Sequence, residues 1–182
     1  DMIDAQTPRA GGVLTYGQTY PNWALGQSNR GEHPYFWIDL LTRSVWNGLT
    51  WVDENLEPQL ELAASATPSD DLTVWDIGLR EGVMFHDGTE MTAADVVSSM
   101  EFHMLGGVGL IRGQVARVEA VGPYAVRFHL QAPNAEFPMI LSDTRTHVTK
   151  AGLEDFSGQP PGTGPFRVVA FSPGSRYVLA RN

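Results

Sequence analysis

The sequence predicts an α+β fold, in which hairpins form a mixed sheet and helices pack against it. Apolar and polar residues alternate over 126–130, which predicts a half-buried strand. Apolar residues recur at helical spacing over 34–48 and 92–105, which predicts two packed helices. Turn residues at Gly122-Pro123 and Pro173-Gly174 separate short extended runs, as in hairpins.

The first quarter of the chain predicts an arm, a strand, a loop and a helix. Residues 1–12 contain Pro and Gly breakers, and a short strand is expected over 13–16. Residues 17–33 are rich in Gly, Asn, Gln and Ser, and a loop of this length is often functional. The helix over 34–48 has one apolar stripe, formed by Trp37, Leu40, Leu41, Val45 and Leu49.

Extended runs over 60–67 and 72–79 predict a hairpin, because Ser69-Asp70-Asp71 between them is a turn sequence. An earlier strand is expected to turn at Asp53-Glu54-Asn55. The run over 72–79 does not alternate cleanly, so we expect both of its faces to be partly covered.

The second helix is predicted to begin at Thr92, a residue that suits an N-cap. Asp95 follows three residues later, as the acidic residue of a capping box does. Asp87-Gly88 just upstream predicts a tight turn that leads into this helix.

The remaining chain predicts strands, a short helix and a linker. Residues 115–121 are expected to pair with 126–130, and a short helix is expected over 135–142 with Asn134 as its cap. Residues 152–164 hold four Gly and two Pro and are interpreted as a linker. A last hairpin is expected, with strands over 166–171 and 177–181.

Composition excludes several classes of function. Acidic residues outnumber basic ones by 21 to 12, giving a formal charge of −9, which disfavours binding to nucleic acid or to an anionic membrane. The absence of cysteine excludes thiol catalysis, cysteine-based zinc sites and disulfides. No run of 18 apolar residues occurs, so no membrane-spanning helix is expected.

Motifs for catalysis are weak. His86-Asp87-Gly88 fits a turn, and Glu101-x-His103 lacks the spacing of a zinc-binding HExxH helix. No serine lies in a G-x-S-x-G elbow. We therefore expect no enzyme, no catalytic or metal-binding residue and no cofactor. A metal-dependent hydrolase that uses His86 and His103 is the weakest alternative.

The run Leu-Arg-Glu-Gly-Val-Met-Phe-His-Asp-Gly-Thr over 79–89, followed by Met-Thr-Ala-Ala-Asp-Val-Val over 91–97, resembles the signature of the family 5 extracellular solute-binding proteins. Residues 121–133 are similar to the family's Val-x-x-x-x-Val-x-Phe-x-Leu-x-x-Pro strand. Residues 162–166, Gly-Thr-Gly-Pro-Phe, match another family element. The ordered series makes the resemblance specific, although Ala66 stands where the family usually has Trp.

The resemblance implies part of a periplasmic-binding-protein type II fold, in which two lobes close on a solute. Residues 1–30 would then be the arm, first strand and cleft loop of the first lobe. Residues 31–160 would be an inserted α+β subdomain, and 161–182 a hairpin that returns to the first lobe. Members of the family are far longer, so the chain is expected to be an N-terminal fragment.

The function implied is that of the receptor of an ABC importer for a peptide, nickel chelate or related small solute. It would be exported to the periplasm, with its signal peptide absent from this chain, and would dock on ABC permease subunits. The fragment alone would bind solute weakly or not at all. A free-standing protein-interaction module is the other alternative.

Residues that would contact the solute follow from the resemblance as well. The loop after the first strand lines the cleft in the family, which indicates Gln18, Thr19, Tyr20 and Trp23. Arg145 lies near the position of a cleft-facing arginine in nickel and peptide binders, and its guanidinium suits a carboxylate.

Overall fold

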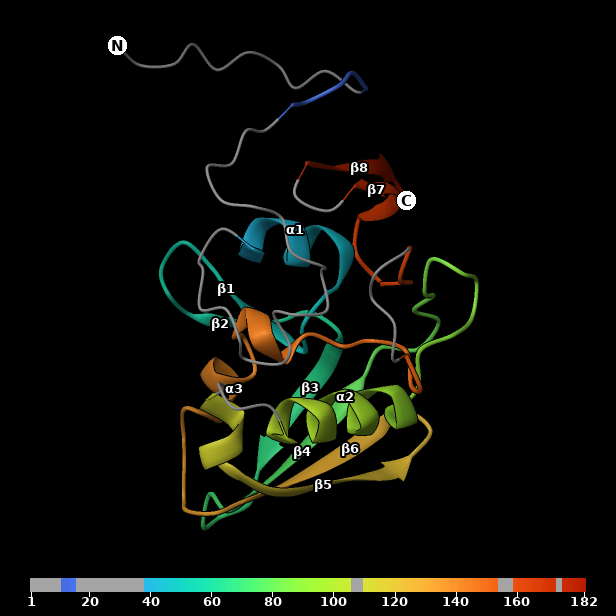
Figure 1. The fold of residues 1–182 in the computed structure, drawn as a ribbon. Helices are drawn as coiled ribbons and strands as arrows, with labels where there is room; N and C mark the ends of the chain where they lie inside the picture. The colour runs from blue at the N-terminus through green and yellow to red at the C-terminus, as the bar shows by residue number, and fades with distance from the viewer. Residues whose placement is uncertain (1–10, 16–37, 106–109, 154–158, 173–174) are drawn as a thin grey trace, which may run out of the picture.

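The structure is a computed structural model that describes residues 11–15, 38–105, 110–153, 159–172 and 175–182. Its largest element is a four-stranded antiparallel sheet in the order β3-β4-β6-β5. The strands are β3 (Ala63–Pro68), β4 (Val74–Leu79), β5 (Val115–Gly122) and β6 (Ala125–Leu130). Helix α2 (Ala93–Leu105) packs on one face of this sheet, mainly over β5 and β6 (Figure 1).

Shorter elements surround the sheet. Strands β1 (Thr50–Val52) and β2 (Pro58–Leu60) form one hairpin, and β7 (Phe166–Ser172) and β8 (Arg176–Arg181) form another. The described chain also contains the helices α1 (Ile38–Val45) and α3 (Phe137–Ile140) and two 3₁₀ helices, η2 (Leu110–Gly113) and η3 (Thr144–Thr146). The α+β class, with hairpins and packed helices, is confirmed, and each described pair of strands is antiparallel.

The main core fills the space between the sheet and α2. Val126, Phe128 and Leu130 point into it from β6, as their alternation predicted, and Phe128 lies against Phe137 of α3 with 5.2 Å between ring centroids. On the outer face, Arg127 forms a bidentate ion pair with Asp76 at 2.7 and 2.8 Å. One face of β6 is therefore apolar and buried, and the other is charged.

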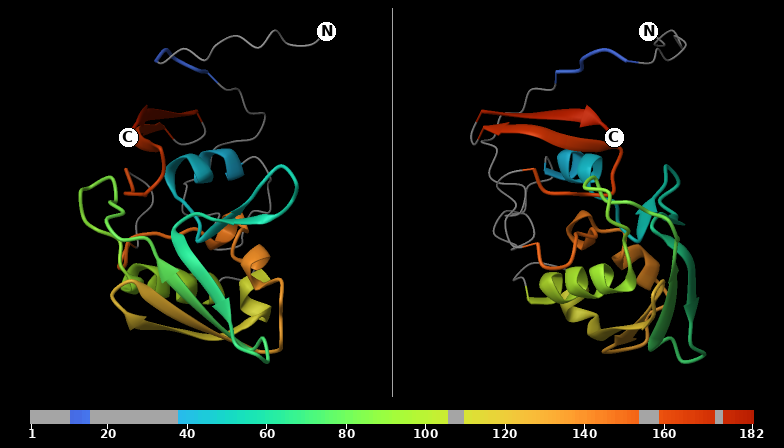
Figure 2. Two further views of the ribbon diagram at one scale, coloured as in Figure 1. Left: turned by 180° about the vertical axis from the view of Figure 1, so that it is seen from behind. Right: turned by 90° about the vertical axis from the view of Figure 1, so that its right-hand side faces the viewer.

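A second, smaller cluster lies between α1 and the β7–β8 hairpin. Its buried members are Val45 and Trp46 at the end of α1 and Val168 of β7. Phe171 and Tyr177 pack against them and stack on each other at 4.3 Å. Figure 2 shows the hairpin lying over α1, away from the four-stranded sheet.

One expectation is met and one differs. In strand β4, Trp75, Ile77 and Leu79 are buried, and Val74, Asp76 and Gly78 on the outer face are half-buried, so both faces are covered at least in part, as expected. The strand predicted over 13–16 does not form at residues 11–15, where Val13 and Leu14 are 96% and 93% exposed. A strand needs a partner for its backbone groups, and no described strand pairs with these residues.

Candidate functional site

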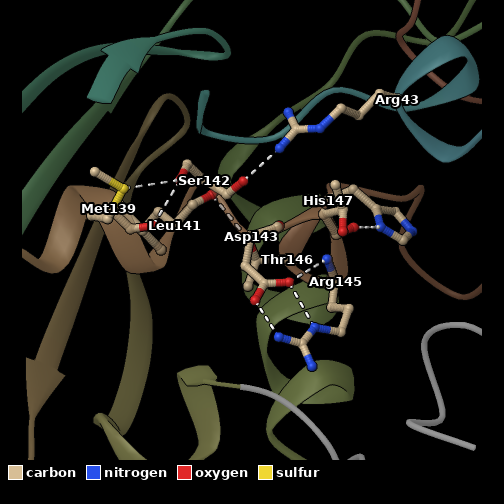
Figure 3. A network of polar contacts seen from close by, with 9 residues as sticks. Arg43, Met139, Leu141, Ser142, Asp143, Arg145, Thr146 and His147 are labelled. Carbon is tan, nitrogen blue, oxygen red and sulfur yellow. Dashed lines mark hydrogen bonds and ion pairs between the residues drawn. The ribbon is translucent and has the colours of Figure 1, made fainter. Parts of the chain in front are cut away.

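Arg145, one of the residues expected to contact solute, lies on η3 and is held by Asp143 (Figure 3). Arg145 Nε donates to Asp143 Oδ1 at 2.7 Å, and Nη2 donates to Oδ2. The backbone N–H of Arg145 also donates to Asp143 Oδ1, at 2.9 Å, which makes Asp143 the N-cap of η3. The guanidinium is thus oriented by two bonds to one carboxylate, which also holds the backbone of Arg145.

The pair is unequally exposed. The Arg145 side chain is 34% exposed, whereas Asp143 is 11% exposed. Burial by itself would raise the pKa of Asp143, but the hydrogen bonds from Arg145 and the charges of Arg145 and Arg43 hold that pKa below its ordinary value. Asp143 is therefore ionised at neutral pH, and the Arg145 side chain that pairs with it is partly exposed to solvent.

A second guanidinium approaches the same loop from α1. Arg43 Nη2 donates to the backbone carbonyl of Ser142 at 2.7 Å (Figure 3). Together Arg43, Asp143 and Arg145 carry a net charge of +1 at neutral pH. Such a cluster can attract an anionic group, and a guanidinium matches a carboxylate in geometry.

Three buried rings, those of Trp46, His103 and His147, pack next to the loop that carries Asp143 and Arg145. His147 stacks on Trp46 at 5.2 Å between centroids, and His103 of α2 meets His147 edge-on at 5.3 Å. His147 Nδ1 lies 2.8 Å from the Thr144 carbonyl, and His103 Nε2 lies 2.8 Å from the His147 carbonyl. A carbonyl only accepts, so each of these ring nitrogens carries the proton.

Both imidazoles are held neutral. Desolvation lowers the pKa of His103 to about 4. Desolvation, and then the neighbouring His103, lower the pKa of His147 to about 3. His103 Nδ1 and His147 Nε2 are buried without a hydrogen-bond partner. These rings act as packing behind the loop that carries Arg145.

The signature region has the structural role that its turn chemistry predicted. Asp87 Oδ1 accepts from the backbone N–H of Thr89 at 3.0 Å, which shapes the turn. Asp95 Oδ2 accepts from the backbone N–H of Thr92 at 2.7 Å, the acidic half of a capping box. Asp95 Oδ1 also accepts from Ala151, so α2 is tied to the chain that follows η3.

His86 and His103 lie apart in the fold, and each bonds to backbone carbonyls. Among the residues that the structure describes, no three His, Asp or Glu side chains gather in a way that would hold a metal ion. The other expected contacts, Gln18, Thr19, Tyr20 and Trp23, lie outside the described residues.

Sequence reasoning selected Arg145 but missed the residues that position it. The Asp-x-Arg spacing of 143–145 was an available signal, because an Asp side chain often binds the backbone N–H two residues on. Arg43 gave no such signal, since it meets the loop only through a contact from α1. The stacking of His147 on Trp46 is likewise a tertiary contact that the sequence does not show.

The comparison with known protein families gives a match over residues 57–182 to the bacterial extracellular solute-binding proteins, family 5, middle region. The chain belongs to family 5 of the extracellular solute-binding proteins. This region holds the four-stranded sheet, α2, the 3₁₀ helix η3 with Arg145, and the β7–β8 hairpin. The resemblance drawn from the signature motifs is confirmed.

Relatives in family 5 differ in what they bind. The chain is 31% identical to the glutathione-binding protein GsiB of Escherichia coli K12 over 159 residues, which are 80% of this chain and 31% of GsiB. It is 33% identical to a nickel ABC transporter structure from Bacillus halodurans, with a TM-score of 0.70 over 79% of this chain and 30% of the other.

A third family 5 relative is the oligopeptide-binding protein AppA of Bacillus subtilis, solved with a nonapeptide. It is 26% identical, with a TM-score of 0.72 over 85% of this chain and 33% of AppA. The structural relatives are periplasmic binding proteins of the type II fold, which confirms the expected fold. The chain spans about a third of the length of these relatives.

The relatives are named as binding or transport proteins and not as enzymes. The family is one of extracellular proteins. In the described part of the chain, no helix has the length and apolar character needed to cross a membrane.

Proposed function

We propose that this chain is part of the solute-binding receptor of an ABC importer and that its solute carries a carboxylate. Membership in family 5 over residues 57–182 is the observation that carries the receptor function. The carboxylate follows from the partly exposed Arg145 guanidinium, which Asp143 orients. Glutathione and peptides, the ligands named for two relatives, both carry carboxylates.

The receptor would work by closing two lobes on the solute and docking on permease subunits in the periplasm. Residues 1–30 and 161–182 are proposed to belong to the first lobe, and 31–160 to an inserted subdomain. The β7–β8 hairpin packs on the end of α1 and not on the four-stranded sheet, which supports the separation of 161–182 from the sheet. The same cluster of Val45, Trp46 and Val168 groups α1 with the hairpin. Gln18, Thr19, Tyr20 and Trp23 remain proposed contacts on the first lobe.

Calorimetry with a polypeptide as long as the relatives tests the function. Titrations would use glutathione, short peptides and nickel–histidine. Binding of one of these at micromolar concentration is expected, and no heat from any of them would contradict the proposed solute class. The 182 residues alone are expected to bind at least about 100-fold more weakly, because a two-lobed site buries its solute from both sides.

A substitution separates the role of Arg145 from the function as a whole. Arg145→Lys should weaken binding about 10- to 100-fold, because a lysine cannot keep the planar fork that meets a carboxylate. Arg117→Lys is the matched control, since Arg117 pairs with Glu119 on the outer face of the sheet. Equal affinities of the two variants for the solute would show that Arg145 does not contact it.

A further inference from the structure

Residues 161–164, here termed the return segment, precede β7 and lie along the end of α1. Trp46 Nε1 donates to the Pro161 carbonyl at 3.0 Å, and the Gly164 N–H donates to the Val45 carbonyl at 2.8 Å. The return segment is therefore bonded to α1 at both of its ends.

His86 binds the other side of the return segment through three contacts. Its backbone N–H donates to the Gly162 carbonyl at 2.8 Å. Its Nδ1 accepts from the Gly162 N–H at 3.1 Å, and its Nε2 lies 2.9 Å from the Gly164 carbonyl. A backbone N–H can only donate and a carbonyl can only accept, so the contacts assign the neutral tautomer with the proton on Nε2.

The return segment has no room on the side of α1. A Cβ on Gly162 would lie 1.9 Å from the Val45 carbonyl oxygen, and one on Gly164 would lie 2.6 Å from the Ser44 carbonyl oxygen. The two glycines let the backbones of α1 and the return segment touch. The return segment is thus held between α1 on one side and His86 on the other.

We infer that His86 is a proton-operated latch on the return segment. A proton taken from solvent onto Nδ1 uses the lone pair that accepts the Gly162 N–H. Two N–H groups then face each other, and that bond is lost. The bond from Nε2–H to the Gly164 carbonyl survives, so acid loosens the latch at Gly162 first.

Two acidic side chains that the described residues place near the latch are already paired or hydrogen-bonded. Asp87, next to His86, forms an ion pair with Lys150 Nζ at 2.6 Å. On the side of the β1–β2 hairpin, Glu61 accepts from Asn47 Nδ2 at 2.7 Å and from the Gly48 N–H at 2.8 Å. Residues 161–164 carry no ionisable side chain. Within the described part of the chain, the ionisable side chain that bonds to the return segment is therefore that of His86.

Nuclear magnetic resonance of the 182-residue chain tests this inference without any solute. Imidazole nitrogen shifts report the tautomer and the titration of His86. The hydrogen-exchange protection factor of the Gly162 amide, corrected for intrinsic exchange, should fall about 5- to 10-fold as His86 protonates. The Gly164 amide, whose acceptor is the Val45 carbonyl, should change less than about twofold.

Two variants serve as controls. His86→Asn should make protection of the Gly162 amide independent of pH, while His129→Asn on the outer sheet face should behave like the original chain. A proton on Nδ1 at neutral pH would overturn the inference. So would Gly162 protection that stays constant while His86 titrates, and both results come from the unsubstituted chain even if a variant does not fold.

Discussion

Arg145 and Asp143 are two residues apart, yet their arrangement depends on distant parts of the chain. Asp143 is mostly buried, which is costly for a charged group unless it is paired and hydrogen-bonded. Arg145 supplies that pairing, and Arg43 adds a second positive charge from α1. The signature motifs identified the family, and the family resemblance selected Arg145 as a candidate, but a neighbour brought in from α1 has no pattern in the sequence.

At the residue scale, the buried histidines predict a loss of stability in acid. In the unfolded chain a histidine takes up a proton near pH 6.5, but His103 and His147 do so only near pH 4 and 3 in the folded chain. The stability gained from burying these rings in the neutral form is fully present above pH 6.5, and it is lost as pH falls toward 4 for His103 and toward 3 for His147. Between these limits the free energy of unfolding should fall by up to about 1.4 kcal/mol per pH unit for each histidine.

Urea unfolding between pH 7 and 5 measures this slope. His147→Asn keeps a donor for the Thr144 carbonyl but cannot titrate, so the slope should become shallower whatever the variant does to stability at pH 7. An unchanged slope would show that His147 is not held neutral by burial.

At the element scale, β6 and α2 could be predicted from periodicity, because each buries one regular face. Strand β5 and the last hairpin bury no regular face, and they were predicted from the turn residues at Gly122-Pro123 and Pro173-Gly174. The prediction failed where a strand needs a tertiary partner. Residues 13–15 have strand composition and no described strand to pair with.

Gly162 gives a prediction at the same scale. Gly162→Ala should destabilise the chain by about 3 kcal/mol or more, because its Cβ would overlap the Val45 carbonyl, a backbone atom that cannot turn aside. Gly113→Ala is the matched control, since a Cβ there meets no atom within 4 Å. Thermal or urea unfolding compares the two, and equal stability would mean that the return segment can shift away from α1.

At the scale of the whole molecule, the two hydrophobic clusters differ in size. Among the described residues, the main cluster joins the four-stranded sheet, α2 and α3, whereas the smaller one has Val45, Trp46 and Val168 as its buried members. Because local stability follows buried apolar contact, we expect the β7–β8 hairpin to open more readily than the sheet.

Hydrogen exchange followed by mass spectrometry tests this difference in the 182-residue chain. Amides of β7 and β8 should exchange at least about tenfold faster than those of β4 and β6 at pH 7. Equal rates would mean that the two clusters unfold as one cooperative unit. Addition of the rest of a family 5 lobe should slow exchange in the hairpin and leave β4 and β6 unchanged.

The backbone bond between Val45 and Gly164 brings together two points that are far apart in the sequence. The chain between them, which includes the four-stranded sheet, therefore begins and ends at neighbouring points. A domain whose entrance and exit touch can be gained, lost or exchanged without moving the scaffold on either side. Because these two points are neighbours, joining residues 45 and 164 through a short turn should remove the chain between them, with its four-stranded sheet, and keep α1 beside β7.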